Sequence, residues 1–172
     1  MLGEQAQSIV LVEQLVDGIL DGAINYADIA GGVSQGLLLY YMGVTAQDEA
    51  AKAKALSYLR DRTTRSAAKI FPGPVAGYYL DEVDFSEVLV AATANAGSTR
   101  DVGKAVEAAS HDLLTRRFVC VALFHDGVKA RASGDEVKCM QRMQICSALE
   151  DPLIEHEWYL ARWELRRKTS EW

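Results

Sequence analysis

Apolar residues recur along much of the chain every three or four positions, which is the spacing of a helix face that packs on a core. The first segment shows this pattern clearly and predicts a helix over about residues 5–23. Its apolar stripe lies opposite three acids (Glu13, Asp17 and Asp21) and consists of Ile9, Val12, Val16, Ile19 and Leu20. Strand-like patterns occur only at residues 77–80 and 118–121. We interpret the second as part of a buried helix, because its flanks keep the helical period.

Capping residues and helix breakers divide the rest of the chain into further helices. Ser34 is expected to cap a short apolar helix that ends at Gly43. Four more starts are indicated by an acid that follows a Ser, Thr or Asp by three residues, at Thr45–Asp48, Asp84–Glu87, Ser98–Asp101 and Ser133–Glu136. The first of these helices should end near Ile70, and the third should run over about 99–126 and end near Gly127. Asp151-Pro152 is expected to start the last helix.

These patterns together predict an all-α fold. We expect a single domain over residues 1–172, built as a bundle of six to seven helices. One irregular crossover is expected at 71–83, where the run Pro72-Gly73-Pro74 interrupts the helical pattern. A chain of this length buries roughly two-thirds of its unfolded surface, so a substantial core is expected.

Charge is distributed unevenly along the chain. The sequence has 24 acids and 18 bases, for a net charge of −6, but residues 1–51 contain no Lys or Arg at all. Residues 52–69 then carry six bases against one acid, and residues 70–99 again carry no base. A uniformly basic nucleic-acid binder is excluded, and we do not expect nucleic-acid binding. The basic stretch either pairs with the acidic segments inside the domain or leaves an acidic surface that attracts a basic protein partner. A further alternative, diluted by the nearby acids, is that the stretch binds phosphate through Arg60, Arg62, Arg65 and Lys69. The densest acidic cluster is Asp81, Glu82, Asp84 and Glu87.

Known catalytic patterns do not occur in the chain, and we assign no catalytic residue, no metal and no cofactor. Glu107 and His111 are one turn apart and face the same way, which is the best partial metal pattern present. His125 lies fourteen residues further along the same expected helix, about 21 Å away at ~1.5 Å per residue, so one ion cannot reach both histidines.

Three cysteines are an odd and sparse set, which favours reduced thiols in a cytoplasmic compartment. Cys120 lies in an apolar run and is expected to be a core thiol that burial makes inert. Cys139 and Cys146 are expected on one helix, about 10 Å apart along its axis, which forbids a disulfide between them. No apolar run approaches the ~20 residues that span a bilayer, and no secretory signal is visible at Met1–Gln7.

Two aromatic groups are candidates for contact with a partner. Tyr78 and Tyr79 lie in the irregular segment, which either presents their rings to a partner or packs them on the core. Trp158, Trp163 and Trp172 all fall in the last fifteen residues. On a helix, one face of this segment carries Ile154, Trp158, Ala161 and Leu165, whereas Trp163 points elsewhere, among Tyr159, Arg162, Arg166 and Arg167. We weigh a docking helix with one face on its own domain and another on a partner against a simple closing helix.

The leading hypothesis is a non-enzymatic protein-binding domain, an acidic inhibitor, immunity or adaptor protein that occludes a more basic protein partner. Its expected contact residues are Asp81, Glu82, Asp84, Glu87, Tyr78, Tyr79, Trp158, Trp163 and Arg166. One alternative is a structural or accessory subunit of a larger assembly, which allows an oligomer. Another is a helical enzyme or ligand-binding domain with a pocket near 71–82 and Glu107–His111.

Overall fold

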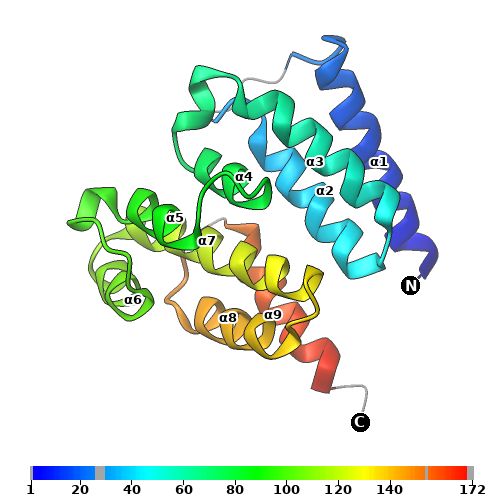
Figure 1. The fold of residues 1–172 in the computed structure, drawn as a ribbon. Helices are drawn as coiled ribbons and strands as arrows, with labels where there is room; N and C mark the ends of the chain where they lie inside the picture. The colour runs from blue at the N-terminus through cyan, green and yellow to red at the C-terminus, as the bar shows by residue number, and fades with distance from the viewer. Residues whose placement is uncertain (1, 26–29, 154, 170–172) are drawn as a thin grey trace. The chain divides into compact units, whose positions relative to one another are not determined.

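The computed structural model describes residues 2–25, 30–153 and 155–169, and every regular element in these ranges is a helix (Figure 1). This confirms the predicted all-α fold. The described ranges contain nine α-helices and two short 3₁₀ helices, where the sequence predicts six or seven helices. The contacts divide the chain into two compact units, residues 1–83 and 84–172, and each unit is described by itself. A single domain over 1–172 stays a prediction.

The first unit contains four α-helices and a short 3₁₀ helix: α1 (Leu2–Leu20), α2 (Val33–Ala46), α3 (Glu49–Thr63), η1 (Ser66–Lys69) and α4 (Gly73–Tyr79). α2 packs mainly against α3, and α1 contacts both of these helices. Ile9, Val16 and Ile19 of the predicted α1 stripe are buried, whereas Leu20 at the end of the helix is exposed. The hydroxyl of Tyr58 in α3 donates a hydrogen bond to the carbonyl of Gly32, 2.8 Å away, and so ties α3 to the start of α2.

The second unit contains five α-helices and a short 3₁₀ helix: α5 (Phe85–Ala92), η2 (Ala94–Ala96), α6 (Val102–His111), α7 (Leu113–Ala132), α8 (Glu136–Ala148) and α9 (His156–Thr169). α7 is the central helix of this unit, because it contacts α5, α6, α8 and α9. Residues 118–121 are helical within it, as predicted, and residues 119–128 are all buried.

Three of the helix starts differ from the sequence prediction in the same way. Five helices begin at an aspartate whose carboxylate accepts a hydrogen bond from a backbone N–H of the first turn: Asp48, Asp84, Asp101, Asp112 and Asp135. Only Asp84–Glu87 forms the complete predicted capping box. At Thr45, Ser98 and Ser133 the cap is an aspartate two or three residues further on, since a carboxylate accepts as well as a hydroxyl and adds a favourable charge at the helix N-terminus.

Other predicted boundaries are also wrong. Ser34 does not cap α2, which starts at Gly32 without a side-chain cap. The expected helix over 99–126 is two helices, α6 and α7, separated at Asp112. α3 ends at Thr63 rather than near Ile70, and the last helix begins at His156 rather than at Pro152. The expected irregular crossover at 71–83 contains a helix, α4, because the two prolines fall at its start, where a missing N–H removes no helical hydrogen bond.

Two glycines that we expected to end helices lie inside them. α2 continues through Gly43 to Ala46, and α7 continues through Gly127 to Ala132. A Cβ at Gly43 would lie 2.9 Å from the backbone nitrogen of Lys52, and one at Gly127 would lie 3.2 Å from the carbonyl oxygen of Cys139. Both glycines therefore allow the close approach of a neighbouring helix, α3 in the first case and α8 in the second.

Candidate functional site

The last helix, α9, has two faces of different character. Glu157, Trp158, Ala161 and Glu164 are buried against the rest of the second unit. On the opposite side Tyr159 and Trp163 have 54% and 47% of their surface exposed, and Arg162 and Arg166 are exposed beside them. These four positions follow the i, i+3, i+4, i+7 spacing of one helix face, which we call the α9 face. Trp158 of the predicted contact set belongs to the buried face, and Ile154 and Trp172 lie outside the described residues.

Arginine side chains lie over both tryptophan rings of this helix. The guanidinium of Arg162 is 4.4 Å from the ring centre of Trp158, and that of Arg167 is 5.0 Å from the ring centre of Trp163. The rings of Trp158 and Tyr159 meet edge to face with centres 5.0 Å apart. Cation–π contacts of this kind restrain the side chains, so less conformational entropy is lost when the α9 face is covered.

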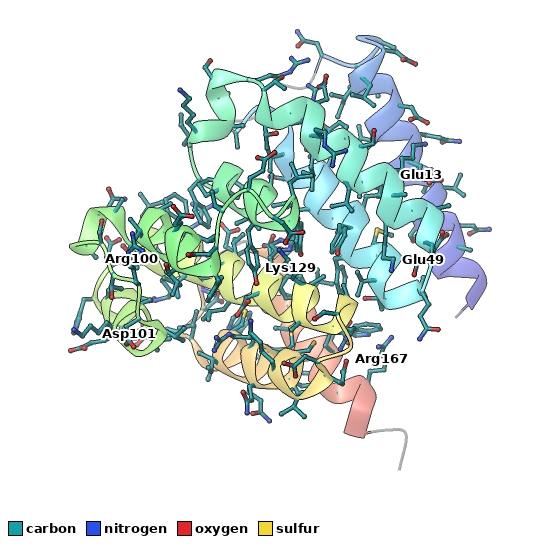
Figure 2. All side chains as sticks on the ribbon, in the orientation of Figure 1. Glu13, Glu49, Arg100, Asp101, Lys129 and Arg167 are labelled. Atoms are coloured by element: carbon teal, nitrogen blue, oxygen red, sulfur yellow. The ribbon has the colours of Figure 1, made fainter. Side chains whose placement is uncertain are left out.

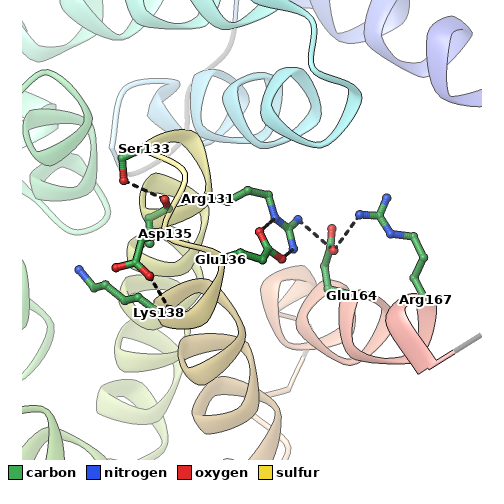
Figure 3. Close-up of polar contacts among 8 residues, drawn as sticks. Arg131, Ser133, Asp135, Glu136, Lys138, Glu164 and Arg167 are labelled. Carbon is green, nitrogen blue, oxygen red and sulfur yellow. Dashed lines mark hydrogen bonds and ion pairs between the residues drawn. The ribbon is translucent and has the colours of Figure 1, made fainter. Parts of the chain in front are cut away.

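A buried carboxylate, Glu164, holds the C-terminal half of α9. Its side chain is fully buried and lies 3.0 Å from Arg131 of α7 and 3.4 Å from Arg167. Arg131 also forms two hydrogen bonds of 3.1 Å with Glu136 of α8, so one guanidinium joins three helices (Figure 3). Burial acts to lower the pKa of Arg131, but the carboxylates of Glu136 and Glu164 outweigh it and raise the pKa above its usual value. Arg131 therefore stays charged at the centre of this network.

A second buried carboxylate, Glu157, holds the first turn of α9. Its Oε1 lies 3.1 Å from Nε2 of His156 and 3.6 Å from Nε2 of His125, which is buried in α7. Burial alone would raise the pKa of Glu157, but the two imidazoles outweigh burial and hold that pKa well below its usual value. The interaction with Glu157 raises the pKa of His156, whereas burial lowers the pKa of His125. The carboxylate of Glu157 therefore favours the charged form of His156, whereas burial favours the neutral form of His125.

The third buried carboxylate, Asp126 of α7, pairs with two bases of α8. It lies 2.8 Å from Lys138 and 2.6 Å from Arg142. The sequence analysis missed all three buried carboxylates, because charged residues on helices are expected to face solvent. A usable signal exists in α9: Glu157 and Glu164 are seven residues apart, and both lie on the same stripe as Trp158 and Ala161.

The predicted acidic cluster is exposed at all four positions, and we call it the acidic segment: Asp81, Glu82, Asp84 and Glu87. Two of its carboxylates form hydrogen bonds at the start of α5. The side chain of Asp84 accepts from the backbone N–H of Glu87, and that of Glu87 accepts from the N–H of Asp84, both at 3.0 Å. Hydrogen bonds from Ser86 and from the backbone N–H of Glu87 lower the pKa of Asp84, so it carries its charge at neutral pH.

Tyr78 and Tyr79 are buried in α4, which corrects the expectation that their rings are exposed for a partner. The ring centre of Tyr79 lies 4.2 Å from that of Tyr40 in α2, so the other possibility, that the tyrosines pack on the core, is the one observed. The physical reason is that residues 73–79 form a helix instead of an open loop, and both tyrosines occupy buried positions of this helix.

The basic residues of 52–69 largely meet acids of their own unit. Lys54 of α3 lies 2.7 Å from Asp17 of α1, and Lys52 pairs with Glu49. Glu49 is the first residue of α3 and is labelled in Figure 2. Arg62 is buried, lies 2.8 Å from Asp61 and stacks over the Tyr58 ring at 5.1 Å. Arg65 lies 3.7 Å from the same carboxylate. The internal pairing with an acidic segment that we weighed therefore exists at Lys52 and Lys54, whereas Arg62 and Arg65 pair with Asp61 of the basic stretch itself.

The other residues considered for metal binding or catalysis do not come together in the described ranges. Glu107 and His111 are both exposed on α6. Among the residues that the structure describes, no group of three His, Cys, Asp or Glu side chains is placed to hold a metal ion. The three cysteines are buried free thiols, and Cys139, Met143 and Cys146 lie along one buried face of α8, as predicted.

Comparison with known proteins assigns the chain to no family. No protein-family model matches the chain, and neither a curated protein nor a solved structure matches it. None of the helices in the described part of the chain has the length and apolar character needed to cross a membrane. The α9 face and the acidic segment are exposed features of the described residues that combine residue types common at protein interfaces.

Proposed function

We propose that this chain is a non-enzymatic helical protein-binding domain, an inhibitor, immunity or adaptor protein, that contacts its partner through the α9 face. The observation that carries the proposal is the pair of half-exposed rings, Tyr159 and Trp163, on a helix whose other face is buried. Trp, Tyr and Arg are the residues most enriched at the energetic centres of protein interfaces, and this face combines all three.

The residue types of the α9 face indicate which groups the partner should present to it. Arg162 and Arg166 lie on either side of Trp163 along the helix, and guanidinium groups bind carboxylates and carbonyl oxygens with good geometry. The contact patch on the partner is therefore expected to be an apolar pocket for Trp163 with acceptor groups at its rim. Covering both aromatic rings removes apolar surface from water, which supplies the driving force.

A second version of the proposal uses the acidic segment and a basic partner surface. It is supported by the exposure of all four carboxylates at Asp81, Glu82, Asp84 and Glu87. Like charges held in one short segment speed the approach of an oppositely charged protein, and the bound chain then occludes that surface. Because Asn caps a helix about as well as Asp, Asp84→Asn removes a charge and keeps the cap. On this version Asp84→Asn with Glu82→Gln weakens binding, more so at low salt, with only a small loss of stability from the charge removed at the α5 N-terminus.

The other two hypotheses are separated from the first by simple observations. An accessory subunit of an assembly would purify with a fixed stoichiometry or as an oligomer, which light scattering measures. A ligand pocket near 71–82 would need Tyr78 and Tyr79 to line a cavity, whereas Tyr79 packs on Tyr40. The three-cysteine set favours a reducing compartment, so we place the binding event in the cytoplasm.

The test is quantitative affinity capture from the cell in which the protein is native. Wild-type protein is compared with Trp163→Ala and with Val137→Ala, a matched control because Val137 is 71% exposed on α8. A partner should be captured by the wild type and the control but on the order of tenfold less by Trp163→Ala, as for an interface hot spot. Equal capture by all three proteins would place the contact elsewhere. A wild-type protein that is monomeric and captures no stable partner would refute protein binding.

A further inference from the structure

Two thiols from different helices meet inside the second unit. The Sγ atoms of Cys120 in α7 and Cys146 in α8 are 3.3 Å apart, and neither residue is exposed to solvent. The Sγ of Cys146 also lies 3.5 Å from the carbonyl oxygen of Cys120, so this side chain points at the backbone of α7. A disulfide needs its sulfur atoms about 2.0 Å apart, so the pair has only a little over ~1 Å to close.

The register of the helix pair explains this contact. α7 and α8 are consecutive helices joined by a three-residue turn, and Gly127 of α7 lies against the backbone of Cys139 in α8. Cys120 is seven residues before Gly127, and Cys146 is seven residues after Cys139. In an antiparallel pair, equal steps in opposite directions along the chain bring residues together again two turns further on. The same step places Cys139 about 10 Å along the helix axis from Cys146.

We propose that Cys120 and Cys146 form a redox modification site, at which a small peroxide oxidises the two thiols to an intramolecular disulfide. In the first step one thiol loses its proton, its sulfur attacks a peroxide oxygen, the O–O bond breaks, and a sulfenic acid and one water form. In the second step the other sulfur attacks the sulfenic sulfur, the S–O bond breaks, and its proton leaves with the hydroxyl as a second water. Two electrons pass from the two sulfurs to the peroxide.

Burial sets the speed and the selectivity of this reaction. A small uncharged oxidant reaches a closed core more readily than a bulky disulfide reagent does, since it needs only a local opening of α8 from α7. The hydrogen bond with Cys146, together with burial, raises the pKa of Cys120 far above its usual value, so little thiolate is present at neutral pH. The oxidation is therefore expected to be slow and to accelerate as the pH rises.

The site is tested on the full chain with hydrogen peroxide as the probe. The protein is oxidised under native conditions, the remaining thiols are alkylated after denaturation, and the protein is digested with trypsin. Cleavage after Lys and Arg leaves the three cysteines on separate peptides, 118–129, 139–142 and 143–162, so each linkage is identified by mass. The same samples are compared by thermal unfolding.

The expected result is a reducible link between peptides 118–129 and 143–162, with a Tm about 5–10 °C above that of the reduced protein. Cys139→Ala should keep this link and Cys120→Ala should abolish it. If Cys120→Ala does not fold, the peptide map of the oxidised wild-type protein still tests the proposal. The proposal is overturned if links to peptide 139–142 form in equal yield, if the cysteines become sulfinic acids without linking, or if all three thiols remain alkylatable after oxidation. None of these outcomes depends on the proposed protein partner.

Discussion

Three buried carboxylates are the unusual residues of this molecule: Asp126, Glu157 and Glu164. Each lies within ion-pair distance of two bases of the second unit. Moving a charge out of water is costly, and a buried carboxylate is tolerated only while its partners remain in place. The position of α9 therefore depends on particular charged partners as well as on apolar packing.

The first prediction concerns Arg131, which joins α7, α8 and α9. Arg131→Met should lower the free energy of unfolding by about 2–4 kcal/mol, because it removes a charged partner, 3.0 Å away, from the buried carboxylate of Glu164. Urea unfolding measures the loss. Adding Glu164→Gln to this variant should recover part of the stability, since the buried charge that has lost this partner is then gone.

Lys104→Met is the matched control for this prediction. Lys104 is exposed on α6 of the same unit, and its substitution should change the free energy of unfolding by no more than about 0.5 kcal/mol. If Arg131→Met costs no more than this control, the buried network does not stabilise the unit.

The second prediction is a pH dependence at His156. The folded pKa of His156 is raised above 6.5, its ordinary value, so the stability that it contributes is fully present below pH 6.5 and is lost as the pH rises through the folded pKa. Glu157 acts in the opposite sense: its pKa is lowered, so its contribution is present above 4.5, its ordinary value, and is lost in acid. The stability gap between wild type and His156→Gln should thus be larger near pH 6 than near pH 9, as urea unfolding at both pH values measures.

His111→Gln serves as the control for this pH effect, because it also removes one imidazole but from an exposed position on α6. A gap for His156→Gln that stays constant or widens towards pH 9 would contradict the assigned ion pair with Glu157. His125 does not disturb the comparison: burial lowers its pKa, so it destabilises only as the pH falls below 6.5, and it is present in both proteins.

At the scale of the elements, helix contact through glycine leads to the third prediction. Gly127→Ala should lower the free energy of unfolding by about 1–3 kcal/mol, because its Cβ would meet the carbonyl oxygen of Cys139 and the Cβ of Arg142 at 3.2 and 3.1 Å. Gly103→Ala on the exposed side of α6 is the control: its Cβ would lie 3.2 Å from Oδ1 of Asp101, an exposed side chain that can shift where the backbone of Cys139 cannot, so its effect should stay within about 1 kcal/mol. Thermal unfolding of both variants measures the two effects. Equal effects would contradict a packing role for Gly127.

Helix periodicity made the all-α fold predictable, but the helix ends were less predictable. Gly43 and Gly127 have the local sequence of a helix stop, and only the packing of the next helix shows that they are contact points. Asp112 falls inside one continuous apolar pattern, yet its carboxylate accepts from the N–H of Thr115 at 2.6 Å and starts a new helix. At the two glycines the deciding contacts are between helices, whereas at Asp112 the deciding contact is a local cap that the apolar pattern does not reveal.

The fourth prediction separates the two faces of α9. Trp158→Ala should lower the free energy of unfolding by about 3–5 kcal/mol, because Trp158 is buried and its indole N–H donates to the carbonyl of Leu149, 3.2 Å away. Trp163→Ala should change it by less than about 1 kcal/mol, since half of the ring is already in water. Chemical denaturation of both variants compares them directly. A Trp163→Ala protein as unstable as Trp158→Ala would make Trp163 a structural residue and not a contact residue.

For the molecule as a whole, much of the acidic excess is structural. Five aspartates cap helices, and three further carboxylates are buried against bases. Fewer acids are therefore available to a partner than the total of 24 suggests. The acids of the acidic segment stay exposed, although two of them also form a capping box.

The two-faced character of α9 was predictable from the sequence. The spacing of Tyr159, Trp163 and Arg166 relative to Trp158 follows from helix geometry alone, and the exposure of these residues agrees with it. The position of Tyr78 and Tyr79 was not predictable in the same way, because two prolines and two glycines suit both a loop and the first turn of a helix.

The most direct test of protein binding through α9 is site-specific photo-cross-linking in the native cell. A photoreactive phenylalanine analogue replaces Trp163 in one strain and Val137, the exposed control on α8, in another. The account predicts one dominant cross-linked protein from position 163, at much lower yield from position 137. Cross-linking from position 163 that is diffuse, or no stronger than from position 137, would contradict it.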